Sequence, residues 1–234
     1  MPGAKSQPDA DKMKNLTSLY LRSSLEAFNK LLALPNDANQ PATLEPNIRW
    51  MENKLQHLGF ITERLPTEGL DLLLAEKTVA QASQTVLVYL QLDGQPVSPS
   101  HWEQRSPYQA TIKTKDQTGT WKMMSWEELN QNIEPDWRLF ARSASDAKGP
   151  IVAFLTAYKI LIDEGWQHDY NLKIIIDSEE ELGSPHLPQA VKRFRDRLAA
   201  DMLIIFDGPR HLSNLPTLTF GARGIATLRI TTYG

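Results

Sequence analysis

The chain has 234 residues, no cysteine and a formal net charge of −3, with 41% hydrophobic and 23% charged side chains. This composition is typical of a folded soluble protein and excludes a collagen, a disulfide scaffold and a chain that is disordered throughout. The missing cysteines exclude thiolate zinc sites, iron–sulfur clusters and a cysteine nucleophile, and the near-neutral charge gives no general attraction to nucleic acid.

The N-terminal segment is polar and contains prolines, so we expect residues 1–15 to form a flexible tail. Its basic side chains are not followed by the apolar stretch of a secretory signal. The longest apolar runs, such as VLVYL and MLIIF, are far shorter than the roughly 20 residues needed to cross a bilayer. We therefore expect a cytoplasmic location and no membrane partner.

Two helices precede the first strands. Apolar residues recur at helical spacing from Leu16 to Leu34, and Pro35 ends that pattern. A second helix fits Pro46 to Leu58, because its apolar side chains share one stripe and a glycine follows. Short runs rich in strand-forming residues come next, at 60–65 and 70–76.

From residue 85 onwards strands and helices alternate. Continuous apolar runs predict buried strands at 85–90, 172–177 and 202–206, and helical spacing predicts helices at 150–165 and 187–200. This alternation indicates an α/β fold with a mostly parallel sheet flanked by helices. Residues 98–137 are polar and rich in Trp, and we expect them to form a long excursion before a further strand, WRLFA, at 137–141.

Carboxylates follow the predicted strands, and each of four strand ends is followed by at least one: Asp93, Asp146, the run from Asp177 to Glu181, and Asp207. Taken singly, such acids are most often solvated loop residues or helix N-caps. Ligands of open α/β sheets bind beyond the carboxyl ends of the strands, so we expect these acids to converge. Converging carboxylates raise one another's pKa, and a divalent cation would relieve that repulsion. A metal hydrolase is therefore one option.

Three motifs follow one another in a recognisable order: ASDAKGP at 144–150, EEELGSP at 179–185 and FDGP at 206–209. Together with the segment LDGQP after the strand at 85–90, they resemble the M20 family of metallopeptidases, the aminoacylase, carboxypeptidase G2 and carnosinase group. The resemblance covers roughly residues 16–234. It implies a zinc-dependent enzyme that hydrolyses peptide or N-acyl amino acid bonds through a metal-bound water.

The resemblance also implies roles for individual residues. Asp146 matches the aspartate that bridges two Zn²⁺ ions, Glu181 a ligand of one ion and Asp207 an acidic ligand of the other. Glu180 matches the general base that activates the bridging water, and Asp93 the aspartate that orients the ligand of the first motif. Members of the family also form homodimers through a lid domain inserted into the catalytic domain.

The sequence departs from the family pattern in three ways. Gln91 stands where the family has a zinc-binding histidine, and Ala147 replaces an acidic residue. A neutral amide oxygen is a weaker ligand than an imidazole nitrogen, so we expect the zinc on the side of Gln91 to bind more weakly or to be absent. The resemblance divides the chain into a catalytic portion at 16–222 and the start of the lid at 223–234, so we expect this chain to lack the rest of the lid and the late metal-binding histidine of the family. Among the five histidines we retain only His211 as a possible member of the acidic rim. The alternative function is a catalytically silent homologue or fragment that serves as a binding or assembly module.

Overall fold

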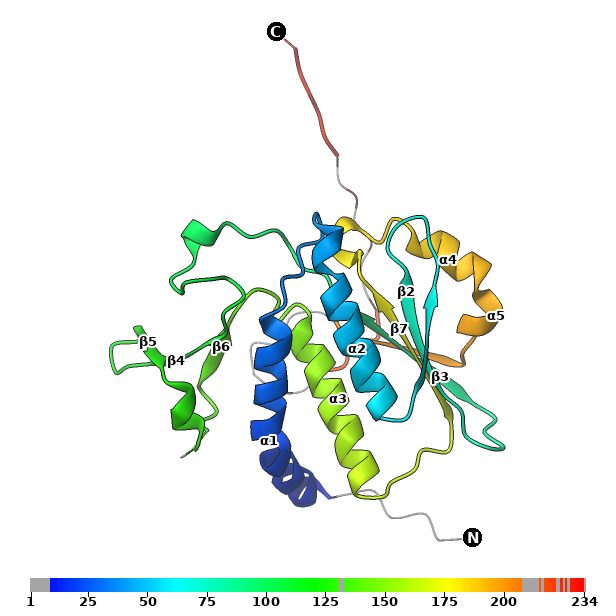
Figure 1. The fold of residues 1–234 in the computed structure, drawn as a ribbon, viewed down its shortest axis with the longest axis horizontal. Coiled ribbons are helices and arrows are strands. Elements are labelled where there is room, and N and C mark those ends of the chain that lie inside the picture. The colour runs from blue at the N-terminus through cyan, green and yellow to red at the C-terminus, as the bar shows by residue number, and fades with distance from the viewer. Residues whose placement is uncertain are drawn as a thin grey trace.

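The computed structural model describes residues 9–130, 133–207, 215, 217–221, 224, 226 and 228–233. Its centre is a five-stranded sheet with the strand order β1-β2-β7-β3-β8 (Figure 1). The strands are β1 (Ile61–Leu65), β2 (Leu72–Lys77), β7 (Asn171–Asp177), β3 (Thr85–Gln91) and β8 (Met202–Ile205). β7 pairs in parallel with β3, and β3 in parallel with β8.

The other half of the sheet is antiparallel. β1 pairs with β2, and β2 with β7, in antiparallel register. A short turn joins β1 to β2, in which the backbone N–H of Gly69 donates to Oγ1 of Thr67, and so short a link leaves only the hairpin arrangement. The expected α/β class is therefore confirmed, but the sheet is mixed rather than mostly parallel.

Helices cover both faces of the main sheet. On one face lie α1 (Ala10–Leu32), α2 (Glu45–His57) and α3 (Lys148–Asp163) (Figure 1). They form the larger core with alternate residues of the strands, such as Ile174 and Ile176 of β7. The opposite face carries α4 (Leu187–Arg193) and α5 (Arg195–Leu198), which pack on Ile175. β7 is apolar on both sides because both of its faces are buried.

Two predicted helix boundaries were wrong. The first helix begins at Ala10, inside the segment expected to be a tail, because Asp9 caps it by accepting a hydrogen bond of 2.7 Å from the backbone N–H of Lys12. Lys12 also forms an ion pair of 2.8 Å with Glu164 after α3. The helix expected at 187–200 is broken at Phe194, whose side chain packs into the smaller core.

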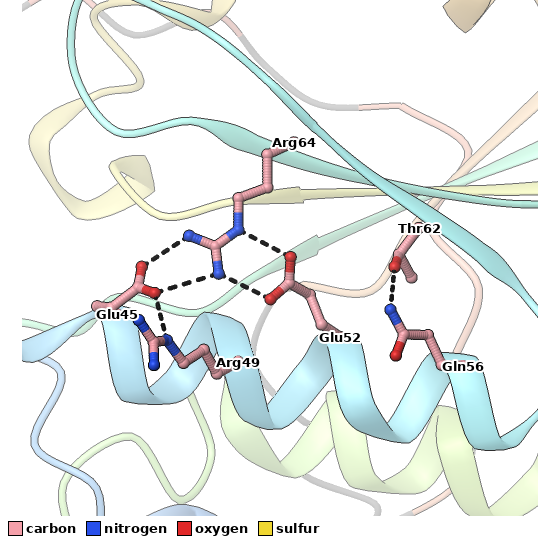
Figure 2. Close-up of polar contacts among 6 residues, drawn as sticks. All are labelled: Glu45, Arg49, Glu52, Gln56, Thr62 and Arg64. Atoms are coloured by element: carbon pink, nitrogen blue, oxygen red, sulfur yellow. Dashed lines mark hydrogen bonds and ion pairs between the residues drawn. The ribbon is translucent and has the colours of Figure 1, made fainter.

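The second helix is fastened to the edge strand by an arginine fork (Figure 2). Arg64 of β1 donates two hydrogen bonds to each of two carboxylates on α2, those of Glu45 and Glu52, at 2.7–3.2 Å. Bidentate pairing of this kind combines charge with fixed geometry. It holds α2 across β1, beside a second contact in which Gln56 donates to Thr62.

The polar excursion forms a separate three-stranded antiparallel sheet with the order β5-β4-β6 (Figure 1). Its strands are β4 (Thr111–Lys115), β5 (Trp121–Met124) and β6 (Arg138–Phe140). β6 is the strand expected to belong to the main sheet, and that expectation was wrong, because β6 pairs with β4. Four short 3₁₀ helices complete the structure: Pro41–Thr43, Pro99–His101, Trp126–Asn130 and Glu180–Leu182. Within the described residues no helix is long and apolar enough to span a membrane.

Candidate active site at the carboxyl ends of β3, β7 and β8

The ladder between β3 and β7 brings two of the acidic motifs together. Gln91, the last residue of β3, lies opposite Asp177, the last residue of β7. The backbone N–H of Leu92 continues the ladder by donating to the Asp177 carbonyl at 2.9 Å. Since both strands end at the same edge, the loops that carry Asp93 and Glu180 start side by side.

Asp93 is fully buried and holds the backbone of the neighbouring loop. Its Oδ2 accepts a hydrogen bond of 2.9 Å from the backbone N–H of Glu181, while its Oδ1 is buried and has no hydrogen-bond partner among the described residues. Burial raises the pKa of Asp93 to about 6, although backbone N–H groups of Glu181 and Glu180 oppose that rise. The contact explains how an aspartate after β3 orients the loop after β7.

Gln91 connects the ASDAKGP motif to the EEELGSP motif by hydrogen bonds. Its amide Nε2 donates to Oδ1 of Asp146 at 3.0 Å and to Oε2 of Glu180 at 3.1 Å. The side chain is 1% exposed, and its Oε1 is buried with no hydrogen-bond partner in the part of the chain that the structure describes. The amide therefore faces the two carboxylates with its hydrogens.

The pKa of Glu180 is affected by its burial and by the acidic residues near it. Its pKa is raised to about 7, chiefly because the carboxyl is partly buried, and further by the negative charges of Asp207, Glu181, Asp93 and Asp146. Those four residues come from the segments that follow β8, β7, β3 and β6. The predicted site residues thus lie on one rim, and the pKa of Glu180 falls in the range suited to a general base near neutral pH.

Asp177 shapes the loop that carries Glu180 and Glu181, a role that the sequence alone did not reveal. Its Oδ1 accepts from the backbone N–H of Glu179 at 2.9 Å. Its Oδ2 accepts from the hydroxyl of Ser184 at 2.6 Å and from that of Tyr89 at 3.1 Å. Asp and Ser at the two ends of DSEEELGS were the available signal, because such side chains commonly close turns by hydrogen bonding.

A second set of missed residues fixes the loop before α3. The Asn36 amide donates to the carbonyl of Leu92 at 2.7 Å and to Oγ of Ser143 at 3.0 Å, and both Asn36 and Ser143 are buried. The Pro-Asn-Asp sequence at 35–37 indicated only the end of a helix. The loop continues through Asp146, whose peptide bond to Ala147 is cis.

Lys148, in the ASDAKGP motif, serves the fold rather than the rim. The side chain is fully buried, and its Nζ donates to the carbonyls of Leu31 at 2.9 Å and Leu34 at 2.6 Å, at the end of α1. Cations stabilise helix C-termini in this way because the last carbonyls have no intrahelical partner. Burial lowers the pKa of Lys148 to about 7.

The side chains present do not fit the two-zinc centre that the family resemblance implies. The amide of Gln91 offers hydrogens to Asp146, whereas a zinc ligand must offer a lone pair. Among the described residues, no three His, Asp or Glu side chains converge closely enough to hold a metal ion. Glu181 accepts a hydrogen bond of 2.7 Å from Gln95, and Asp207 is exposed. His211 lies outside the described residues.

Comparisons with known proteins agree with this architecture. The model of peptidase family M20/M25/M40 matches residues 92–217. A cysteinylglycine-S-conjugate dipeptidase from Corynebacterium striatum is 30% identical over 190 residues, 80% of this chain and 36% of that protein. A Beta-Ala-His dipeptidase from Mus musculus is 26% identical over 235 residues, 92% of this chain and 43% of that protein. The chain thus spans less than half the length of these relatives.

Solved structures share the fold. The M20 family metallo-carboxypeptidase Sso-CP2 from Sulfolobus solfataricus aligns with a TM-score of 0.63 and 27% identity, over 79% of this chain and 37% of that one. Human carnosine dipeptidase 1 aligns with a TM-score of 0.65 and 23% identity, over 85% of this chain and 41% of that one. The mixed sheet and its helices are therefore an arrangement found in larger enzymes.

Proposed function

We propose that this chain, which belongs to the peptidase family M20/M25/M40, supplies the proton-transfer part of a site that hydrolyses the amide bond of dipeptides or N-acyl amino acids. One observation carries the proposal: the Glu180 carboxyl is partly buried, accepts a hydrogen bond from Gln91 and lies near carboxylates from four segments, and its burial, followed by their negative charges, raises its pKa to about 7. A carboxyl with that pKa accepts a proton from an attacking water and returns it to the leaving amine near neutral pH.

The substrate class is proposed from the relatives. Their names specify dipeptides, cysteinylglycine conjugates in one case and Beta-Ala-His in the other. In this scheme Glu180 carries the proton, and Asp93 holds the backbone of Glu181 in place through its contact of 2.9 Å. For zinc we propose fewer than two ions per chain, because Gln91 donates hydrogen bonds at the position where the family has a histidine ligand.

The second candidate function is a silent binding or assembly module. It is favoured by the two hydrogen bonds of Gln91, which occupy Asp146 and Glu180. We also propose that residues 16–222 form the catalytic portion, that the location is cytoplasmic, and that dimerisation, where it occurs, uses the lid domain implied by the family resemblance. These proposals add nothing to the choice between the two functions, which depends on the chemistry at position 91.

The test measures hydrolysis of Cys-Gly, β-Ala-His and an N-acetyl amino acid with zinc or manganese present. We expect Gln91→His to exceed the unaltered chain by about tenfold or more, since general base and metal effects each contribute at least that much. Glu180→Ala should abolish activity in both backgrounds. Activity that survives Glu180→Ala would refute the role of Glu180. Inactivity of metal-loaded Gln91→His towards all three substrates would instead favour the silent module.

A further inference from the structure

The position of the Gln91 amide is set by the sheet. Gln91 ends strand β3, which lies between β7 and β8, and the ladder to β7 fixes its backbone opposite Asp177. The side chain is 1% exposed, so surrounding atoms leave it little freedom to move. From there Nε2 reaches Asp146 at 3.0 Å and Glu180 at 3.1 Å, which uses both amide hydrogens.

The chemistry of the neighbours determines which way the amide faces. A rotation that exchanged its oxygen and nitrogen would point Oε1 at two carboxylates, and three acceptors would then face one another without a hydrogen. With respect to the described residues, the observed orientation leaves Oε1 as the one amide atom without a partner, which costs less than that repulsion. The amide hydrogens thus neutralise part of the negative charge of Asp146 and Glu180.

From these contacts we propose that the Gln91 amide replaces a metal ion between Asp146 and Glu180, so that this side of the rim is held together without metal and binds zinc weakly. An ion that used Asp146 would have to break a charge-assisted hydrogen bond and turn the amide oxygen towards itself. A neutral amide oxygen is then a poorer ligand for zinc than the imidazole nitrogen it replaces.

The proposal rests on the same carboxylates as the proposed function, but its test uses metal binding and thermal stability rather than substrate. A chain that passes this test and hydrolyses nothing would keep the inference and lose the proposed activity. Gln95 provides a matched control, because its amide also donates to a rim carboxylate, that of Glu181 at 2.7 Å, from an exposed position and without bridging two acids.

The first arm measures zinc binding by isothermal titration calorimetry. We expect Gln91→His to bind zinc at least about tenfold more tightly than the unaltered chain, because histidine restores a nitrogen ligand. Adding Asp146→Asn should remove that gain. Equal zinc affinity of the unaltered chain and Gln91→His would overturn the proposal, and so would a gain that survives Asp146→Asn, since the ion would then bind elsewhere.

The second arm measures thermal unfolding in chelator by circular dichroism. Gln91→Leu should lower the melting temperature by about 3–8 °C, because two hydrogen bonds to charged groups are lost in a chain of this size. Gln95→Leu should change it by less than about 2 °C. Equal melting temperatures of Gln91→Leu and Gln95→Leu would contradict the proposal that the Gln91 amide holds Asp146 and Glu180 together. If Gln91→Leu does not fold, while Gln95→Leu does, the result still supports it, and the zinc arm remains decisive.

Discussion

Gly94 offers a direct test of how the loops beside the rim are packed. A Cβ added at this position would lie 2.3 Å from Oγ of Ser143 and 3.1 Å from Nδ2 of Asn36. Neither group can simply move aside, since they are buried and hydrogen-bonded to each other at 3.0 Å. We therefore expect Gly94→Ala to lower the free energy of unfolding by about 1–3 kcal/mol, as overpacking of a filled interior does.

Removing the hydroxyl should rescue this variant. Ser143 has a φ of 61°, which glycine adopts freely, so Ser143→Gly relieves backbone strain while it loses the hydrogen bond to Asn36. These effects are of similar size, and the single variant should lie within about 1 kcal/mol of the unaltered chain. With Gly94→Ala added, we expect a favourable coupling of about 1–2 kcal/mol.

The measurement is urea unfolding of the unaltered chain, the two single variants and the double variant. Their free energies of unfolding are compared provided that the four m-values agree. Additive free energies would show that Ser143 does not obstruct a side chain at Gly94. That result would refute the packing argument, whichever single variant is the less stable. A loss in Gly94→Ala larger than about 3 kcal/mol that Ser143→Gly leaves unchanged would place the obstruction elsewhere.

Two further predictions concern charged groups. Arg64→Lys should lower the free energy of unfolding by about 1 kcal/mol, because lysine cannot pair bidentately with both carboxylates of α2. The control Arg49→Lys changes a single exposed ion pair and should cost less than about 0.5 kcal/mol. Equal losses of the two variants in urea unfolding would refute the role of the arginine fork. The raised pKa of Glu180, about 7, means that the folded state binds more protons than the unfolded one between about pH 4.5 and 7, so its contribution to stability falls as pH rises through that window. Between about pH 4.5 and 7 this effect should lower the free energy of unfolding by about 1–2 kcal/mol after allowance for solvent screening, and Glu180→Gln should remove that decrease. Identical pH profiles of stability for the two proteins would contradict the raised pKa.

Local patterns were sufficient for most of the fold. The apolar runs at 85–90, 172–177 and 202–206 became the parallel strands β3, β7 and β8. The expected burial was wrong for β8, whose four residues are exposed, because β8 is the last strand of the sheet and the described residues do not cover it. The small sheet was not predicted, because its strands are short and their pairing is tertiary. For the same reason β6 was assigned to the wrong sheet.

The site divides in a similar way. Motifs and strand ends were enough to bring the acidic residues to one rim, because the carboxyl ends of parallel strands share an edge. The roles of Asn36 and Asp177 were missed. Asn36 contacts Ser143, which is distant in the sequence, and Asp177 closes a turn whose geometry local patterns do not encode. Gln91 was expected to be a weak ligand, but its role as a donor depends on which atoms surround it and became visible only with Asp146 and Glu180 in place.

Two buried acceptors at the end of β3 show what the glutamine has changed. Oε1 of Gln91 and Oδ1 of Asp93, which follows two residues later, both lack a hydrogen-bond partner within the described ranges. A histidine at position 91 has one nitrogen for a metal and one N–H for a carboxylate, whereas glutamine has its donors on a single nitrogen. Gln91 directs those donors to Asp146 and Glu180, so that among the described residues Asp93 accepts hydrogen bonds from backbone donors alone. Its burial raises its pKa to about 6. Gln91 therefore links Asp146 to Glu180 and leaves Asp93 with no side-chain donor from the residues that the structure describes, so a substitution at position 91 should affect both groups.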